Sequence, residues 1–279
     1  MKQDLPVPRF YPNEEIDSIR LLKVLRVRNN GEVWCAGNLE TGELCAVKFL
    51  YPEVLHKERF YAAGRFLQKT NFPSIIKGFQ TGTAVNGASF MVMEYAPGGS
   101  LREVLKRCGR ITFPQGVSLM RQMLNALCLL QQHGAVHRDI KPENIWIAAD
   151  GTLRLGDFGI ARFPEVPEEA GRIFGTARYC APEQAVDSSK ADFRSDLYSL
   201  GAVLFEALSG TYFRSTDSFS DAVRKKEFPD SALDEFSTPG FTGLIAELLA
   251  FSPAARPASP REVLEKLDTM GLPESDFAS

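Results

Sequence analysis

The sequence predicts an α+β fold in two parts, a small antiparallel β-sheet part with one helix and a larger, mainly helical part. Strand-like apolar runs follow one another up to Glu94, and Pro97-Gly98-Gly99 then breaks the chain. Beyond this break, apolar residues recur at spacings of three and four, the period of one buried helix face. The change of period predicts a hinge near residues 94–99.

The first part is predicted to hold five strand segments and one helix. A turn at Thr41-Gly42 separates two of the strands, and residues 53–69 form the helix, although Gly64 lowers its propensity. The eighteen residues before Ile19 carry three prolines and form a leader, either loose or strapped down. The strand runs are Leu21–Leu25, Glu32–Ala36, Glu43–Leu50, Ile75–Gly82 and Ser89–Glu94.

The second part begins with a long predicted helix, which Gly134 terminates. Asp150-Gly151 lies between two short apolar runs and predicts a β-hairpin. From Pro182 to about Met270 the pattern is mostly helical. Apolar positions of the long helix are Val117, Met120, Met123, Leu124, Leu127 and Leu130. The predicted segments are a leader over 1–18, two larger parts over 19–95 and 96–270, and a tail over 271–279.

Composition and charge exclude several classes of protein. Hydrophobic residues make up 44% and charged residues 24%, which is typical of a globular protein, and the net charge of -3 gives no support for a nucleic-acid partner. The five scattered cysteines form no C-x-x-C pair and indicate reduced thiols. Apolar runs such as Ala126–Leu130 are far shorter than the roughly 20 residues that span a bilayer. We therefore expect a cytoplasmic protein without a membrane span, whose regulation does not come from a domain after Met270.

The densest set of polar residues is His137-Arg138-Asp139-Ile140-Lys141-Pro142-Glu143-Asn144, between the long helix and the hairpin. Asp157-Phe158-Gly159 follows the hairpin, and Gly175-Thr176 and Ala181-Pro182-Glu183 come later. Ala46-Val47-Lys48 lies upstream on a predicted strand. In this order and these contexts, the motifs resemble the eukaryotic-type protein serine/threonine kinase family over about residues 19–270. The resemblance implies a two-lobed protein-kinase-like fold.

The resemblance also implies phosphoryl transfer from ATP, with magnesium (Mg²⁺), to a serine or threonine hydroxyl of a protein substrate. Asp139 would orient that hydroxyl, and Lys141 would steady the transferred phosphate. Lys48 would hold the α- and β-phosphates, while Asn144 and Asp157 would supply oxygens to the metal. Lysine two residues after the aspartate is typical of the serine/threonine class.

The family's adenine-binding hinge corresponds to Glu94-Tyr95-Ala96. The resemblance implies that backbone groups of Glu94 and Ala96 bind the adenine edge. Met93 would be the gatekeeper, and Val33 and Ala46 would pack above the base. Two further pairings are implied to be structural: Glu183 with Arg256, and Asp196 with the backbone of the catalytic loop.

Three positions depart from the family pattern. The glycine-rich loop falls on Arg26-Val27-Arg28-Asn29-Asn30-Gly31-Glu32-Val33, where one glycine remains. Glycine lets backbone N–H groups approach phosphate closely, so Arg26 and Arg28 either bring charge instead or point to solvent. The position of the lysine-pairing glutamate falls on Ala63, unless the register differs near Gly64.

Trp146 is the third departure, at a position under the adenine ring. The indole either stacks on the base or fills its pocket. The alternative is that Ile145 or Ile147 faces the base while Trp146 packs elsewhere.

The loop after the D-F-G motif, Ile160 to Phe174, contains no serine, threonine or tyrosine but carries Glu165, Glu168 and Glu169. In related kinases the arginine at the position of Arg138 often receives a loop phosphate. We hypothesise that one of these glutamates serves Arg138 or that a regulatory protein partner sets the loop. A solvated acidic loop is the plainer alternative.

The leading hypothesis for function is an ATP-dependent protein serine/threonine kinase. A pseudokinase acting as a nucleotide-binding or scaffold module is the alternative, because of the arginines in the glycine-rich loop and Ala63. A small-molecule kinase of similar fold is disfavoured by the G-T-x-x-Y-x-A-P-E segment, which forms the peptide-binding shelf in protein kinases.

Overall fold

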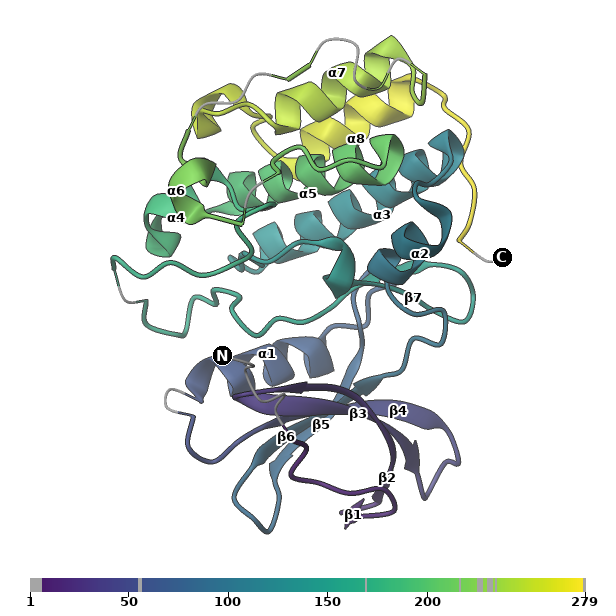
Figure 1. Cartoon of the computed structure of the whole chain (residues 1–279), viewed down its shortest axis with the longest axis vertical. Coiled ribbons are helices and arrows are strands. Elements are labelled where there is room, and N and C mark those ends of the chain that lie inside the picture. The colour runs from purple at the N-terminus through teal and green to yellow at the C-terminus, as the bar shows by residue number, and fades with distance from the viewer. Residues whose placement is uncertain are drawn as a thin grey trace, which may run out of the picture. The chain divides into compact units, whose positions relative to one another are not determined.

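The chain divides into two compact units (Figure 1). The computed structural model describes residues 7–54, 57–168, 170–215, 217–224, 228–229, 233 and 235–277. The first unit comprises Met1–Phe72 and Ile76–Tyr95, and the second comprises Pro73–Ile75 and Ala96–Ser279.

The first unit is a six-stranded antiparallel sheet in the order β1-β2-β3-β4-β6-β5, with helix α1 packed against β5 (Figure 1). Gly64 makes this packing close, since a Cβ there would lie 2.3 Å from Thr81 Cγ2. The element bounds are β1 Glu15–Ile16, β2 Ile19–Arg28, β3 Gly31–Asn38, β4 Leu44–Leu50, α1 Glu58–Lys69, β5 Gly78–Thr83 and β6 Ser89–Glu94.

The leader is attached to this sheet at Arg9 and Phe10. Phe10 is 1% exposed, and its ring stacks on Phe49 of β4 at a centroid distance of 4.0 Å. The buried Glu32 Oε1 accepts the backbone N–H groups of Arg9 and Phe10 at 3.1 and 3.2 Å. The Arg9 guanidinium also lies 3.9 Å above the ring of Tyr51. Apolar burial and backbone hydrogen bonds therefore fix the leader; residues 1–6 lie outside the described residues.

The second unit is mainly helical and is built around α5, most of whose residues are buried. Helices α3 and α7 pack against α5, and α8 packs against α3 (Figure 1). The helices are α2 Leu101–Cys108, α3 Phe113–Gln132, α4 Pro182–Val186, α5 Phe193–Ser209, α6 Phe219–Ala222, α7 Pro239–Leu248 and α8 Pro260–Thr269. Strands β7 Ile145–Ile147 and β8 Leu153–Leu155 form the hairpin, and short 3₁₀ turns span Pro142–Asn144, Ser188–Lys190 and Pro253–Ala255.

Local sequence explains where the first two helices of this unit begin. Ser100 and Glu103 form a capping box at α2, and Thr112 and Gln115 form another at α3. Each box satisfies backbone N–H groups that the first helical turn leaves without partners. Helix α3 ends just before Gly134, whose φ of 64° an L-residue with a Cβ adopts at a cost.

The antiparallel sheet with one helix and the mainly helical second part are confirmed, but two predicted bounds are wrong. The first helix begins at Glu58 rather than at residue 53, because the N–H of Val54 bonds to the carbonyl of Tyr51 in a turn. Strand β5 begins at Gly78 rather than at Ile75. Ile75 instead bridges Leu155 of β8 and belongs to the second unit.

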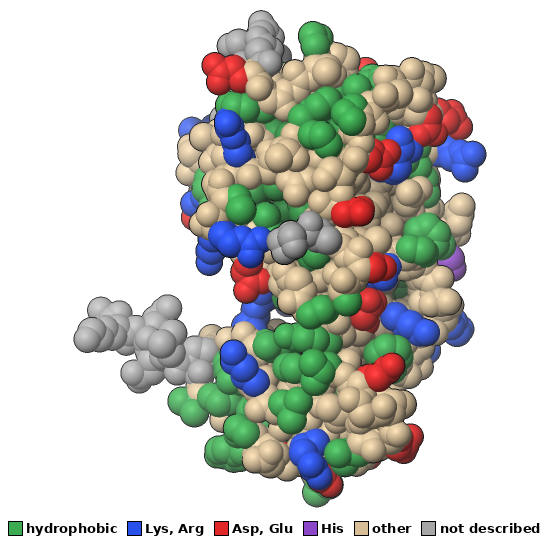
Figure 2. Space-filling model, turned by 90° about the vertical axis from the view of Figure 1, so that its right-hand side faces the viewer, with side chains coloured by type: hydrophobic (Ala, Val, Ile, Leu, Met, Phe, Trp, Pro, Cys, Tyr) green, Lys and Arg blue, Asp and Glu red, His purple; other side chains and the backbone are tan. Residues whose placement is uncertain are grey.

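Side chains of both charges are interspersed on the face shown in Figure 2. Hydrophobic side chains also gather over part of the sheet unit in this view (Figure 2). The outer positions of β2 include the exposed Leu22 and Leu25. Within the part of the chain that the structure describes, no helix has the length and apolar character needed to cross a membrane.

Candidate active site

The loop between α3 and the hairpin is tied to α5 through its backbone. The N–H groups of His137 and Arg138 donate to the two carboxylate oxygens of Asp196, at 2.7 and 2.8 Å. Burial raises the pKa of Asp196 to about 7, while the two amide donors favour its ionised form. The implied role of Asp196 as a clamp on this backbone is confirmed.

The buried side chain of His137 stabilises the same loop through hydrogen bonds and ring packing. Its ring is fully buried, and burial lowers its pKa, so the imidazole is neutral. Nδ1 accepts the backbone N–H of Asp139 at 3.3 Å, which leaves the proton on Nε2 to reach the Gly156 carbonyl at 3.0 Å. The ring also packs edge-on against Phe158, with centroids 4.8 Å apart. His137 thus links the Asp139 backbone to the segment that carries Asp157.

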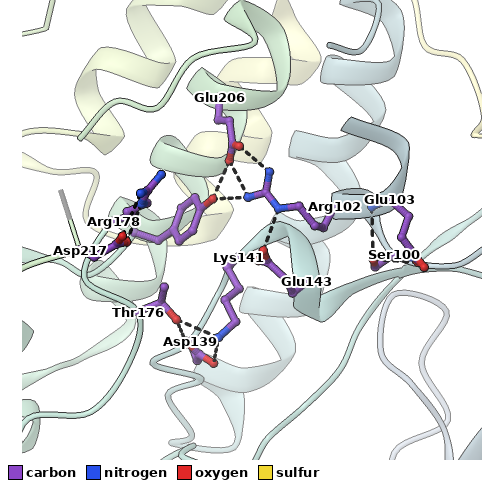
Figure 3. A network of polar contacts seen from close by, with 11 residues as sticks. Ser100, Arg102, Glu103, Asp139, Lys141, Glu143, Thr176, Arg178, Glu206 and Asp217 are labelled. Carbon is purple, nitrogen blue, oxygen red and sulfur yellow. Dashed lines mark hydrogen bonds and ion pairs between the residues drawn. The ribbon is translucent and has the colours of Figure 1, made fainter. Parts of the chain in front are cut away.

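Three donors converge on the carboxylate of Asp139, and Figure 3 shows Lys141 and Thr176 among them. Thr176 Oγ1 donates to Oδ1 at 2.8 Å, and Lys141 Nζ donates to Oδ2 at 2.7 Å. Lys141 Nζ also donates to Thr176 Oγ1 at 2.8 Å, which closes a triangle of polar groups. Asn144 Nδ2 donates to Oδ2 at 3.0 Å and to the Asp139 carbonyl at 2.8 Å. The carboxylate is therefore held in one orientation beside a cation.

Asn144 and Asp157 provide oxygens that suit a divalent cation. Asn144 is fully buried, and its Oδ1 has no hydrogen-bond partner among the described residues. Such an orphaned buried acceptor is costly unless a ligand satisfies it. The N–H of Gly156 donates to the Asn144 carbonyl at 2.9 Å, so the next residue, Asp157, lies close by, with a φ of 59°. Amide and carboxylate oxygens are ligands that Mg²⁺ accepts together with waters and phosphates.

The loop after Asp157 is joined to the catalytic loop by an ion pair. Arg138 Nη1 and Nη2 donate to the two carboxylate oxygens of Glu168, at 2.7 and 3.1 Å. The hypothesis that a loop glutamate serves Arg138 is confirmed, and the residue is Glu168. Glu165 is exposed, and Glu169 lies outside the described residues.

A second buried network was not predicted from the sequence. Arg102 of α2 donates to Glu143 at 2.7 Å and to Glu206 of α5 at 2.6 Å (Figure 3). The Tyr179 hydroxyl, which Arg102 also contacts, donates to Glu206 at 2.6 Å. The signal in the sequence was Glu206 itself, a single acid in the apolar run Ala202–Leu208, since such an acid is buried only when paired.

The pair of Glu183 and Arg256 is confirmed. Arg256 donates to both carboxylate oxygens, at 2.7 and 2.9 Å, and Ser195 Oγ donates to Glu183 at 2.6 Å. Burial alone would raise the pKa of Glu183, but the hydrogen bonds and charge of Arg256 outweigh it and hold that pKa below its usual value.

Five of the predicted site residues lie on neighbouring strands of the first unit. Strand register pairs Val33 with Lys48, and Ala46 with Met93. Glu94 ends β6, and its carboxylate accepts the N–H of Lys77 at 3.2 Å. In the second unit the fold brings together Asp139, Lys141, Asn144 and Asp157, while Ala96 is the first residue after the boundary and Trp146 lies on β7.

The structure shows where the residues of the atypical glycine-rich loop and Ala63 lie. Arg26 and Arg28 belong to β2, which turns at Asn29-Asn30 into β3. Gly31 is needed for close packing, since a Cβ there would lie 2.0 Å from the carbonyl oxygen of Phe49. Ala63 is buried in α1, so this position presents no carboxylate.

The alternation along β7 separates Trp146 from its neighbours. Ile145 and Ile147 are buried in the second unit, at 0% and 4% exposure. Trp146 points to the other face of the strand and is half-buried. Of the three side chains of β7, the indole is therefore the accessible one.

Comparison with known proteins gives the family. Residues 29–267 match the protein kinase domain. The chain belongs to the protein kinase family. It is 35% identical over 250 residues to the serine/threonine-protein kinase PknA of Mycobacterium tuberculosis, a match that covers 85% of this chain. It is 33% identical over 262 residues to the serine/threonine-protein kinase PknB of the same organism, covering 88% of this chain.

This protein kinase domain spans only part of each relative, 57% of the length of PknA and 41% of PknB. The expected protein-kinase-like fold, with an antiparallel sheet lobe and a helical lobe, is confirmed. Protein kinases use ATP and a divalent metal. Among the described residues, no group of three or more His, Cys, Asp or Glu side chains could hold a metal ion by itself. A metal at Asn144 and Asp157 would thus need phosphate or water oxygens as further ligands.

Proposed function

We propose that this kinase domain transfers the γ-phosphate of ATP to a serine or threonine hydroxyl of a protein substrate. The observation that carries the proposal is the fixed carboxylate of Asp139, held by Lys141, Asn144 and Thr176. Thr176 donates its hydroxyl proton to Oδ1, the same interaction that an acceptor hydroxyl of a substrate requires. Asp139 is therefore assigned to orient that hydroxyl and to accept its proton.

Charge neutralisation is the other requirement of phosphoryl transfer. We assign Lys141 to the transferred phosphate because its ammonium lies within hydrogen-bond distance of both Asp139 and Thr176. Asn144 Oδ1 and the Asp157 carboxylate are assigned to Mg²⁺, which would offset phosphate charge when bound. Lys48 is assigned to the α- and β-phosphates by its place in the Ala46-Val47-Lys48 motif.

The adenine contacts are proposed on the same basis. Val33, Ala46 and Met93 lie side by side in the sheet, and the backbones of Glu94 and Ala96 follow them along the chain. Trp146 is the β7 side chain available to a base, since both flanking isoleucines are buried. We expect the indole to stack on the adenine ring.

The scaffold alternative is not favoured. The relatives are named as serine/threonine-protein kinases, and the backbone N–H groups of the catalytic loop at His137 and Arg138 donate to the buried Asp196. The substrate is proposed to be a protein, as those names imply. A cytoplasmic location is also proposed, because all five cysteines are free thiols, which suits a reducing compartment.

The test is label transfer from γ-labelled ATP into the chain itself and into a serine/threonine peptide library. Asp139→Asn should lower the rate by about 10²–10⁴-fold, the range for loss of a positioned acid–base group. The matched control is Asp150→Asn, which changes an exposed aspartate in the β7–β8 turn and should leave the rate unchanged. A thermal shift on adding ATP with Mg²⁺ should persist in Asp139→Asn. Equal label transfer by wild type and Asp139→Asn would contradict the proposal.

A further inference from the structure

Arg138 is a fully buried cation that joins several segments of the second unit. Its Nε donates to the carbonyl of Ile160 at 2.8 Å, and Nη1 donates to the carbonyl of Ser188 at 3.2 Å. The guanidinium also lies 5.6 Å from the ring centroid of Phe174. These contacts reach both ends of the loop that runs from residue 160 to residue 174. The position of Arg138 and the course of this loop are therefore coupled.

Two backbone carbonyls and the ring of Phe174 contact the Arg138 guanidinium, but neutral groups cannot balance its charge. Glu168 supplies the opposite charge. The Glu168 side chain is 15% exposed and meets the guanidinium through two parallel hydrogen bonds. Planar carboxylate and guanidinium groups match in this bidentate geometry, which is the stronger form of the ion pair. Pro167 limits the backbone just before Glu168, and the N–H of Val166 bonds to the carbonyl of Phe163 in a preceding turn. The loop thus presents its carboxylate with little conformational freedom left.

The backbone at Arg138 connects the ion pair with Glu168 to the site residues Asp139 and Thr176. Arg138 has a φ of 66°, an uncommon conformation that the surroundings must maintain. Its carbonyl accepts the side-chain amide of Gln184 at 2.7 Å, and a Cβ at Gly175 would lie 3.0 Å from the same carbonyl oxygen. Asp139 follows Arg138 directly, and Thr176 follows Gly175. Both members of the hydrogen bond between Thr176 and Asp139 therefore depend on the backbone at Arg138.

We propose that Glu168 is a positioning residue for phosphoryl transfer, whose fixed carboxylate keeps residues 160–175 ordered without phosphorylation of this loop. The proposal rests on the proposed function. Phosphate groups order such segments by pairing with arginine, and a carboxylate supplies the same planar pairing with a smaller but permanent charge. The stretch from Ile160 to Phe174 offers no hydroxyl to phosphorylate. The kinase is thus constitutively competent at this loop, and its control must act elsewhere.

The test uses the full chain, treated with phosphatase and checked by mass spectrometry. Dephosphorylated wild type should retain its activity in the label-transfer assay. Glu168→Gln keeps the shape but removes the charge, and should lower kcat by about 10²-fold, the effect of a small misplacement of reacting groups, with little change in KM for ATP. Glu168→Asp should retain part of the activity, and Glu165→Gln is the matched control in the same loop. In Glu168→Ala, added acetate should restore activity in a concentration-dependent manner.

Hydrogen exchange of the same proteins gives a readout that does not need catalysis. Glu168→Gln should exchange faster over residues 160–175, with α3 unchanged. A Glu168→Gln variant with wild-type kcat and wild-type exchange would overturn the proposal, as would a dephosphorylated wild type that regains activity only after phosphorylation. If wild type and Asp139→Asn transfer label equally, the proposed function fails instead. Hydrogen exchange then still decides whether Glu168 orders the loop.

Discussion

Replacing Arg256 by methionine should destabilise the second unit by several kilocalories per mole. The Arg256 side chain is 0% exposed and donates to Glu183 through two nitrogens. It also donates to the carbonyls of Ala250, Arg194 and Phe251, at 2.8, 2.9 and 3.1 Å. Methionine leaves the buried Glu183 with Ser195 as its remaining side-chain donor and removes one hydrogen bond from each of the three carbonyls. Breaking a buried ion pair from one side costs about 3–5 kcal/mol.

The loss can be measured in the second unit by itself. The chain has two tryptophans, Trp34 in the first unit and Trp146 in the second. In a Trp34→Phe background, fluorescence therefore reports urea unfolding of the second unit through Trp146. With a slope of about 1–3 kcal/mol per molar urea, the midpoint should fall by about 1 M or more.

The pH dependence gives an independent check on the cause. Because Arg256 holds the pKa of Glu183 below its usual value, this pair stabilises the fold above the unfolded-state pKa of the carboxyl. The contribution is lost as pH falls through the folded-state pKa. The difference in free energy of unfolding between wild type and Arg256→Met should therefore shrink below about pH 4.

Arg261 supplies the matched control. It pairs with Glu265 at 3.3 Å, but the two side chains are 78% and 66% exposed. Arg261→Met should cost less than about 1 kcal/mol, as exposed ion pairs do. If Arg256→Met cost no more than this control, or if its cost did not change with pH, the reasoning about burial would be refuted.

Three further predictions concern the leader and the polar triangle of Asp139, Lys141 and Thr176. Phe10→Ala should destabilise the first unit by about 3–5 kcal/mol, because the ring is buried against Phe49, and urea unfolding followed by Trp34 fluorescence measures this loss. Burial raises the pKa of Glu32, although two backbone donors oppose it, so stability of the first unit should fall as pH rises from the unfolded-state pKa through the folded-state pKa. Glu32→Gln should abolish that slope, and an unchanged slope would assign it to another group. Thr176→Val removes the hydroxyl bonded to Asp139 and should lower kcat about tenfold, since hydrogen bonds to charged groups contribute about 1.5–3 kcal/mol; an unaltered kcat would show that this bond is dispensable.

The candidate site was predictable where its geometry is local. Asp139, Lys141 and Asn144 lie within six consecutive positions, so the chain itself brings their side chains together once the loop is held. The D-F-G motif follows the hairpin directly, and the hydrogen bond between Gly156 and Asn144 fixes its distance from that loop. Order along the sequence was therefore sufficient to find these residues.

Features that depend on long-range packing could not be predicted from the sequence. The loop carries three glutamates of similar character, and only the folded path of the chain selects Glu168 for Arg138. Arg102 and Glu206 are 104 positions apart, so their pairing follows from the packing of α2 near α5. Ile75 has the apolar character of a strand residue, but it pairs with β8 and belongs, like β8, to the second unit. In each case the residue type indicated that a partner was needed, but the sequence did not identify that partner.

The attachment of the leader to the sheet determines how the first unit unfolds locally. Glu32 lies between Gly31 and Val33 in β3, and its carboxylate is bonded to the backbone at Arg9 and Phe10. Peeling residues 7–16 from the sheet breaks both backbone hydrogen bonds to this buried acid and uncovers Phe49 at the same time. The leader and the β2–β3 hairpin should therefore detach as a single cooperative foldon rather than by fraying from the end. A molecule that captured the detached leader would by the same act release the hairpin tip.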